Sequence, residues 1–301
     1  MRAVLLMGYG AVDELELREV PEPVAGPGEL KVRLVASSVN PIDLKLRSGA
    51  MRQSAPLELP AILGRDASGE VIAVGAGPSA FQVGAQVLGL VHHAYAEYVV
   101  DKEDAWAERP ASLDPVDAAA LPLVVLTGTQ LIEEAVRPRP GEVVLVTGAV
   151  GSVGRAAVFA ARASGAEVVA GVRRVQKEEA SELKVDVVAL DDDAELERLP
   201  RVDAIADTVG GETIQKLLGK VKPGGTIGSV LGEPPGARKR GVAVRAHVNH
   251  PDSRRLAALA QAVAAGELTI PIAGRLPLSQ IREAHTRVAR GAGGKIVLRI
   301  R

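Results

Sequence analysis

One stretch of this chain restricts its fold more than any other. Residues 143–146 form an unbroken apolar run, a turn containing Gly148, Gly151 and Gly154 follows, and an alanine-rich helical segment begins at once. A strand that leads into a helix in this way presents the free N–H groups of the helix start to an anion. Glycine is needed because the backbone turns sharply and a ligand must come close. The stretch therefore predicts a phosphate-binding strand–turn–helix unit.

Strands and helices alternate after this turn. Following the helix of residues 151–164, strands are expected at 167–172, 187–190, 202–207, 225–231 and 242–248, and helices at 177–183 and 212–218. Such alternation predicts βαβ units and a parallel sheet. The strands are nearly continuous apolar runs, which predicts that helices cover both faces of the sheet. The acidic triplet at 191–193 is interpreted as a solvated loop.

The first 120 residues have a different pattern of predicted secondary structure. Short alternating strands are separated by glycine and proline turns, which predicts a compact barrel-like β domain. Within it, Asn40 and Pro41 are a good N-cap and first residue for a short helix that stops before Gly49. Towards the end of the chain, helices are expected at 252–266 and 276–290, and a last strand at 295–300.

Composition excludes several classes of protein. The 301 residues carry a net charge of -1, which gives no argument for binding to nucleic acid or an anionic membrane. There is no cysteine, so disulfides, thiolate zinc sites and a cysteine nucleophile are excluded. No apolar run approaches the roughly 18 to 20 residues of a membrane span, and the apolar start is interpreted as a strand, not a signal peptide. We expect a cytoplasmic protein.

A basic cluster follows the second strand of the βαβ unit. Arg173, Arg174 and Lys177 stand where an acidic residue would hold the ribose of NAD, whereas arginine there accommodates the 2′-phosphate of NADP. Cationic side chains suit a phosphate dianion. The cluster favours NADPH; the alternative is a solvated basic turn. Tyr98 and Lys102 have the spacing of a short-chain reductase pair, but they precede the glycine turn, so we treat the match as chance.

Six further motifs, in a fixed order around the glycine turn, resemble a known family. They are Val39-Asn40-Pro41-Ile42-Asp43 with Arg47-Ser48-Gly49, Leu63-Gly64-Arg65-Asp66 with Gly69, Tyr95-Ala96-Glu97-Tyr98, Ala118-Ala119-Ala120-Leu121-Pro122 with Thr127, Asp207-Thr208-Val209-Gly210-Gly211, and Gly293-Gly294-Lys295-Ile296-Val297. Over nearly its whole length the chain resembles the zinc-free quinone oxidoreductase branch of the medium-chain dehydrogenases/reductases.

The resemblance implies an α/β protein of two domains. A GroES-like β-rich catalytic domain would comprise residues 1–120 and 250–301, and a Rossmann domain with a doubly wound parallel sheet would comprise 121–249. Zinc members have a cysteine near Asn40 and a His-Glu pair where Arg65 and Asp66 stand. Their absence implies no metal, and hydride transfer from NADPH to a quinone or an α,β-unsaturated carbonyl.

Cofactor-binding residues are also implied by the resemblance. Asn40 and Thr127 would position the nicotinamide, and Gly232 lies in a loop expected to close over the cofactor. Lys295 would reach the cofactor or be an ordinary surface cation. The pyrophosphate would lie against Val150, Gly151, Ser152, Val153 and Gly154, and the 2′-phosphate against Arg173, Arg174 and Lys177.

The substrate side is less well defined by the sequence. Asp43, Leu46, Met51 and His92 are candidates, and no tyrosine is available after the Arg47-Ser48-Gly49 segment, where several relatives have one facing the substrate. Asp43 and Arg47 could equally form a helix-surface ion pair. We therefore expect no protein general acid and a final proton from water.

Two rival functions remain open at this point. One is a non-catalytic NADPH-binding sensor or structural protein of the same fold. The other is a zinc alcohol dehydrogenase with unusual ligands, which the lack of cysteine disfavours.

By analogy with relatives, the edge strand at 242–248 would pair across the two-fold axis of a homodimer.

Overall fold

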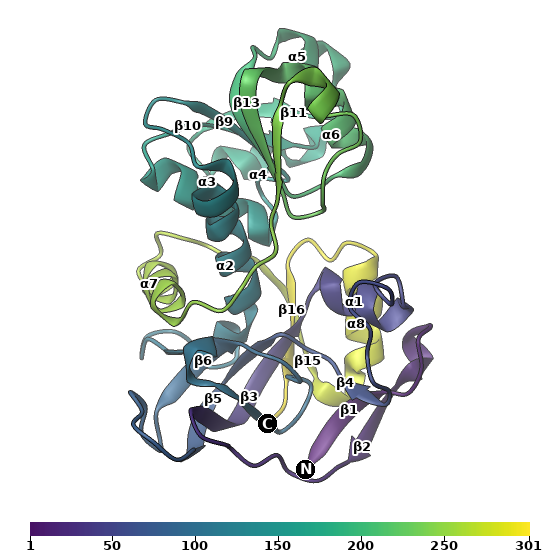
Figure 1. Ribbon diagram of the computed structural model, residues 1–301, viewed down its shortest axis with the longest axis vertical. Helices are drawn as coiled ribbons and strands as arrows, with labels where there is room; N and C mark the ends of the chain where they lie inside the picture. The colour runs from purple at the N-terminus through teal and green to yellow at the C-terminus, as the bar shows by residue number, and fades with distance from the viewer. The chain divides into compact units, whose positions relative to one another are not determined.

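The chain forms two compact units in the computed structural model. The model describes residues 1–301 except the side chain of Arg240. Unit 1 comprises Met1–Leu123 and Pro251–Arg301, and unit 2 comprises Val124–His250. In Figure 1, unit 2 is drawn in teal to green, and unit 1 combines the purple-to-blue start of the chain with its yellow end.

Unit 1 is built on two sheets. The strands are β1 (Arg2–Leu6), β2 (Leu15–Glu19), β3 (Glu29–Val39), β4 (Ala61–Ile62), β5 (Asp66–Val74), β6 (Gln86–Leu90), β7 (Tyr98–Lys102), β8 (Trp106–Glu108), β15 (Ile272–Pro277) and β16 (Lys295–Arg299). Three of them form the sheet β2-β1-β4, and the others form the sheet β15-β16-β3-β5-β6-β8, with β7 also paired to β3. Strand β16 runs antiparallel to β3, as the neighbouring yellow and blue-purple ribbons of Figure 1 show.

Helices of unit 1 pack around these sheets. They are α1 (Pro41–Ser48), α7 (Ser253–Ala264) and α8 (Ile281–Ala289), with short 3-10 turns η1 (Val12–Glu14), η2 (Glu103–Ala105), η3 (Asp117–Ala120) and η8 (Leu278–Gln280). The core between them is aliphatic, and Trp106 and Tyr95 are its largest fully buried side chains.

Unit 2 is a six-stranded parallel sheet. Its strands are β9 (Val143–Thr147), β10 (Glu167–Val172), β11 (Asp186–Ala189), β12 (Val202–Asp207), β13 (Val221–Ser229) and β14 (Ala243–Ala246). They lie in the order β11-β10-β9-β12-β13-β14, and every pair is parallel. This is the doubly wound order, in which the chain starts at the centre of the sheet and winds outward both ways. The expected Rossmann-type sheet is confirmed.

Helices cover both faces of this sheet. They are α3 (Ser152–Ala163), α4 (Lys177–Ser181), α5 (Asp193–Arg198) and α6 (Gly211–Leu217), with the π-helical turn η4 (Leu131–Val136) and the short turns η5 (Arg174–Gln176), η6 (Leu218–Lys220) and η7 (Arg238–Arg240). Val144 and Val146 of β9 enter one hydrophobic cluster, and Leu145 between them enters the other. Alternate side chains of the central strand are therefore buried on opposite faces, as its continuous apolar sequence predicts.

One apolar helical run is long enough to be compared with a membrane span. Residues Asp117–Val136, which include α2 (Pro122–Gln130), form an apolar run of 20 helical residues. Length and composition alone would allow this run to span a membrane, so our expectation that no such run exists was wrong. However, most of this run is buried inside the protein, as in the core helix of a globular fold.

Two local predictions were wrong. The helix expected at 276–290 begins only at Ile281, and residues 272–277 form β15, which pairs in parallel with β16. Leu276 precedes Pro277, and the residue before a proline is driven towards extended backbone. The triplet at 191–193 is not merely a solvated loop, because the Asp192 carboxylate accepts hydrogen bonds from Ala194 N and Glu195 N and so caps α5.

Candidate active site

The glycine turn between β9 and α3 has the geometry of an anion cradle. Gly148 has a φ of +64°, and Gly151 N donates to its carbonyl at 2.9 Å. A Cβ on Gly154 would lie 2.1 Å from that same oxygen, so only glycine fits there. Helix α3 begins at Ser152 with Gly151 as its N-cap, so the first N–H groups of the helix have no intrahelical acceptor. These residues fit the pyrophosphate of a dinucleotide.

A buried arginine that the sequence did not single out holds this turn in place. Arg155 on α3 is only 8% exposed, and its Nε donates to the Val150 carbonyl at 3.0 Å. Its terminal nitrogen donates to Glu179 of α4 at 2.9 Å. A charged side chain inside an alanine-rich helix was the available signal, because buried charges are normally paired.

Asp207, at the carboxyl end of β12, binds three strands together. Its carboxylate accepts hydrogen bonds from Thr147 Oγ1 at 3.0 Å and from Ser229 Oγ at 2.8 Å, which end β9 and β13. It also accepts from the backbone of Gly210 at 2.9 Å. With 1% exposure, it fixes the strand ends instead of facing solvent. The segments that follow β12 and β13 line a pocket of about 410 Å³, and Gly232 lies in its wall.

The basic cluster after β10 is partly neutralised by carboxylates. Arg174 forms an ion pair with Asp192, and Lys177 Nζ lies 2.7 Å from Glu195 Oε1. Arg173 is exposed, and its Nε donates to Gln176 Oε1 at 3.2 Å. Among the contacts described for these side chains, Arg173 is the one cation of the three without an ion pair. Arg174 and Lys177 thus form ion pairs while their side chains stay 68% and 40% exposed, and contact of the cluster with a 2′-phosphate stays a prediction.

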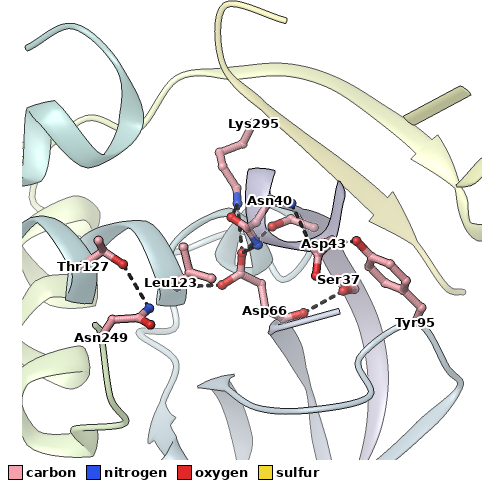
Figure 2. Close-up of polar contacts among 10 residues, drawn as sticks. Ser37, Asn40, Asp43, Asp66, Tyr95, Leu123, Thr127, Asn249 and Lys295 are labelled. Carbon is pink, nitrogen blue, oxygen red and sulfur yellow. Dashed lines mark hydrogen bonds and ion pairs between the residues drawn. The ribbon is translucent and has the colours of Figure 1, made fainter. Parts of the chain in front are cut away.

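In unit 1, Asp66 is the centre of a fully buried polar network. Its Oδ1 accepts from Leu123 N at 2.6 Å, and its Oδ2 accepts from Ser38 Oγ, Asn40 Nδ2 and Lys295 Nζ at 2.6, 2.8 and 2.9 Å. Figure 2 shows the Lys295 ammonium over the Asn40 and Asp66 side chains, and it also donates to Asn40 Oδ1. A carboxylate with four donors is well compensated for its burial.

This network changes the interpretation of two predicted residues. Lys295 is 5% exposed, so the alternative that it is a surface cation is wrong. Asn40 is 0% exposed, and both ends of its amide are already bound, by Asp66 and Lys295. Its contact with a nicotinamide stays a prediction, and the structure gives Asn40 a second role as a bridge between the buried ions.

Asp43 lies beside this network and is also buried. Its Oδ2 accepts from Asn40 N at 2.8 Å and from the Tyr95 hydroxyl at 2.9 Å, so the alternative of a surface ion pair with Arg47 is wrong. Burial raises the pKa of the Asp43 carboxyl to about 6, against the lowering effect of these two hydrogen bonds. The Tyr95 ring meets the buried His285 ring edge-on at 5.8 Å. Burial lowers the pKa of His285 to about 3, and the charge of Arg47 lowers it further.

The other substrate candidates are scattered over unit 1. Leu46 packs partly buried against the core, and Met51 is half-buried in the turn after α1. His92 is exposed and its Nδ1 lies 3.3 Å from Asp101 Oδ2, with no described contact to the network around Asp66. A tyrosine from another part of the chain lies against the Arg47-Ser48-Gly49 segment. It is Tyr9, whose Cβ would be 3.2 Å from a Cβ on Gly49 and whose hydroxyl accepts from Leu57 N at 2.8 Å.

Thr127 lies on α2 in unit 2. It is 8% exposed, and its Oγ1 accepts a hydrogen bond from Asn249 Nδ2 at 3.0 Å, as Figure 2 shows. The hydroxyl is therefore oriented by a residue far along the chain. Its predicted contact with the nicotinamide stays a prediction.

The residues around Asp66 do not fit a zinc ion. Among the residues that the structure describes, no group of three or more His, Cys, Asp or Glu side chains is arranged to hold a metal. The Asp66 oxygens are already used by four hydrogen-bond donors, one of them the Lys295 ammonium, whose positive charge would repel a metal ion.

Two family profiles match the chain, one in each half. The profile described as alcohol dehydrogenase GroES-like domain matches residues 26–111. The profile described as zinc-binding dehydrogenase matches residues 183–298.

Curated sequence relatives are moderately similar. A chloroplastic quinone-oxidoreductase homolog of Spinacia oleracea is 34% identical over 180 residues, 56% of this chain and 55% of that protein. The chain thus spans little more than half of the length of the first curated relatives it matches. A quinone oxidoreductase of Pongo abelii is 28% identical over 99% of this chain and 97% of its own length. A 2-methylene-furan-3-one reductase of Solanum lycopersicum is 32% identical over 79% and 64%.

Solved structures match over the whole chain. The quinone oxidoreductase from Coxiella burnetii has a TM-score of 0.90 and 27% identity, covering 100% of this chain and 99% of its own. An NAD-dependent alcohol dehydrogenase has a TM-score of 0.87 and 28% identity, covering 100% of both chains.

The fold and the glycine turn define a two-domain protein in which a GroES-like domain accompanies a Rossmann-type domain. The chain belongs to the medium-chain dehydrogenase/reductase superfamily, in its quinone oxidoreductase branch.

Proposed function

We propose that this protein is an NADPH-dependent, zinc-independent reductase of quinones or α,β-unsaturated carbonyls. The glycine turn carries the proposal, because its N–H groups at the start of α3 and the forbidden Cβ at Gly154 suit a dinucleotide pyrophosphate. The relatives named as quinone oxidoreductase and as 2-methylene-furan-3-one reductase support the two substrate classes. When bound, the cofactor supplies the hydride.

The protein's own part in this reaction is binding and orientation. In the proposal, the amides of Gly151, Ser152 and Val153 hold the pyrophosphate, while Val150 and Gly154 shape the turn. Arg173 attracts the 2′-phosphate, with Arg174 and Lys177 beside it. The pocket at Gly232 receives another part of the cofactor, and Asn40, Thr127 and Lys295 orient the nicotinamide. Water supplies the final proton, since the described residues offer no exposed acid in the network around Asp66.

Zinc independence is supported by the misfit described above. The chain has no cysteine, and Lys295 already places a positive charge against Asp66. We expect purified enzyme to keep its activity after dialysis against a strong chelator. Stoichiometric zinc by metal analysis, together with loss of turnover on its removal, would contradict this.

The function is tested by a substrate panel. Purified protein with NADPH should reduce benzoquinones or naphthoquinones, or alkenals and enones, followed by loss of absorbance at the wavelength of the reduced nicotinamide. Arg173→Ala should weaken NADPH binding about tenfold and change NADH binding little, because a charged 2′-phosphate contact is worth about 1.4 kcal/mol or more. Tight NADPH binding with no turnover of either class would favour the non-catalytic alternative.

Two further proposals concern the protein as a whole. We propose a homodimer that pairs through β14, the edge strand of the unit 2 sheet, because an exposed edge needs a cover. We also propose a cytoplasmic location, in keeping with a chain without cysteine. Light scattering at micromolar concentration tests the first, and a monomer would refute it.

A further inference from the structure

Two strand ends bring opposite charges together beside the proposed 2′-phosphate site. Strands β10 and β11 are parallel neighbours with Val172 opposite Ala189, so the residues that follow them emerge at the same edge of the sheet. Arg174 follows β10, and its backbone N–H donates to Asp191 at 2.7 Å. Its guanidinium pairs with Asp192, which follows β11.

The two side chains of this ion pair differ in how firmly the surrounding structure holds them. Asp192 has a side chain that is 10% exposed, and its Oδ1 accepts from Ala194 N at 3.0 Å and from Glu195 N at 3.2 Å as the cap of α5. The Arg174 side chain is 68% exposed. The carboxylate is thus fixed by the helix start, whereas the guanidinium can turn to another anion.

We propose that Asp192 is a specificity-determining residue that competes with the 2′-phosphate of NADPH for Arg174. The inference rests on the proposed cofactor site. A phosphate bound there must take the guanidinium from Asp192 and must lie near a second fixed carboxylate, Glu195, which holds Lys177. Asp192 therefore reduces the preference for NADPH over NADH, and this chain accepts both cofactors more evenly than its three basic residues alone would suggest.

The charge of Asp192 can be removed without removing the helix cap. Asparagine is as good an N-cap as aspartate, so Asp192→Asn keeps the acceptor for Ala194 N and Glu195 N. Glu197→Gln is a matched control, because it removes one charge from the same helix at an exposed position with no described side-chain contact.

Binding of 2′,5′-ADP and of ADP to the full chain, measured by calorimetry, compares a ligand that carries the 2′-phosphate with one that lacks it. Asp192→Asn should tighten 2′,5′-ADP about 5- to 10-fold, since a like charge beside the phosphate is removed. It should leave ADP unchanged within about twofold, and Glu197→Gln should change neither ligand. Adding Arg174→Ala to Asp192→Asn should abolish the gain.

Three results would overturn the inference. They are an unchanged or weaker affinity of Asp192→Asn for 2′,5′-ADP, an equal gain in Glu197→Gln, or a gain that persists without Arg174. Thermal unfolding of each variant by circular dichroism verifies that α5 remains formed. Failure of the proposed cofactor site is distinguishable, because then neither ADP nor 2′,5′-ADP would bind even to the unaltered protein.

Discussion

Asp43 and His285 are two buried titratable groups that both contact Tyr95, and their pKa shifts have opposite consequences for stability. The Asp43 pKa is raised to about 6, whereas an aspartate in an unfolded chain has a pKa of about 3.9. The folded state therefore holds a proton that the unfolded state lacks between these values. The contribution of Asp43, about 3 kcal/mol, is present below about pH 4 and is lost as pH rises through about 6.

His285 has the opposite sign. Its pKa is lowered to about 3, whereas a histidine in an unfolded chain has a pKa of about 6.5. The stability that comes from the neutral ring is therefore present above about pH 6.5 and is lost as pH falls towards about 3. Between about pH 4 and 6, the contributions of the two groups to the free energy of unfolding change in opposite directions as pH rises. The charges of Asp66 and Lys295 act on Asp43, and the charge of Arg47 acts on His285.

Two substitutions separate these effects. Asp43→Asn should make the free energy of unfolding rise more steeply with pH between about 4 and 6, because the histidine term is left alone. His285→Phe should make it fall with pH over the same window. Urea denaturation can be followed by fluorescence of Trp106, the single tryptophan of the chain, which is 0% exposed in unit 1. Variants that both keep the slope of the unaltered protein would refute the assignment.

At the scale of elements, the turn between β9 and α3 contains two glycines with different expected roles, one required by the fold and one proposed to lie against the phosphate. A Cβ on Gly154 would lie 2.1 Å from the Gly148 carbonyl oxygen, whereas one on Gly151 would have no neighbour nearer than 3.2 Å. Gly154→Ala should therefore lower the free energy of unfolding by about 1–3 kcal/mol.

Gly151→Ala is the companion variant. We expect it to lower the free energy of unfolding by about 0.5–1 kcal/mol, because alanine is a poorer N-cap than glycine, and to weaken NADPH binding about tenfold, because its methyl group would stand where the phosphate must approach. Circular dichroism reports the stability of both variants, and calorimetry reports binding. Unchanged binding in a folded Gly151→Ala protein would show that the phosphate does not use this turn.

At the scale of the whole molecule, the ion pair between Lys295 and Asp66 ties the last strand of the chain to the first 123 residues. The two side chains are 5% and 0% exposed. Lys295→Met would leave the Asp66 carboxylate buried without its cation, which should cost about 3–5 kcal/mol. Trp106 fluorescence reports this loss, because the tryptophan lies in unit 1.

A second substitution gives the control. Asp66→Asn in the Lys295→Met background removes the unpaired charge. Its amide oxygen can still accept from Leu123 N, and its NH2 group can donate to Asn40 Oδ1 once the Asn40 amide turns over. We expect the double variant to recover most of the lost stability. If Lys295→Met unfolds at the same urea concentration as the unaltered protein, the pair does not hold the last strand.

Local sequence patterns accounted for most of the framework. The strands at 167–172 and 202–207 have the predicted bounds in the structure, because strand period and apolar continuity are properties of neighbouring residues. The β15 strand was missed, since its pairing with β16 overrides a weak local pattern. The cap formed by Asp192 was missed because an acidic run has the same composition in a loop and at a helix start.

The sequence by itself determined the strand–glycine–helix unit, the alternating order of unit 2 and the membership of a superfamily, because short-range geometry and ordered motifs are sufficient for each. Only the tertiary structure decided the electrostatics. Lys295 meets Asn40 across 255 residues of chain, and Arg174 meets Asp192 because two parallel strands end at one edge. Charge pairs depend on distance in space, and burial decides their strength, so no local pattern could reveal which cations of this chain are already neutralised.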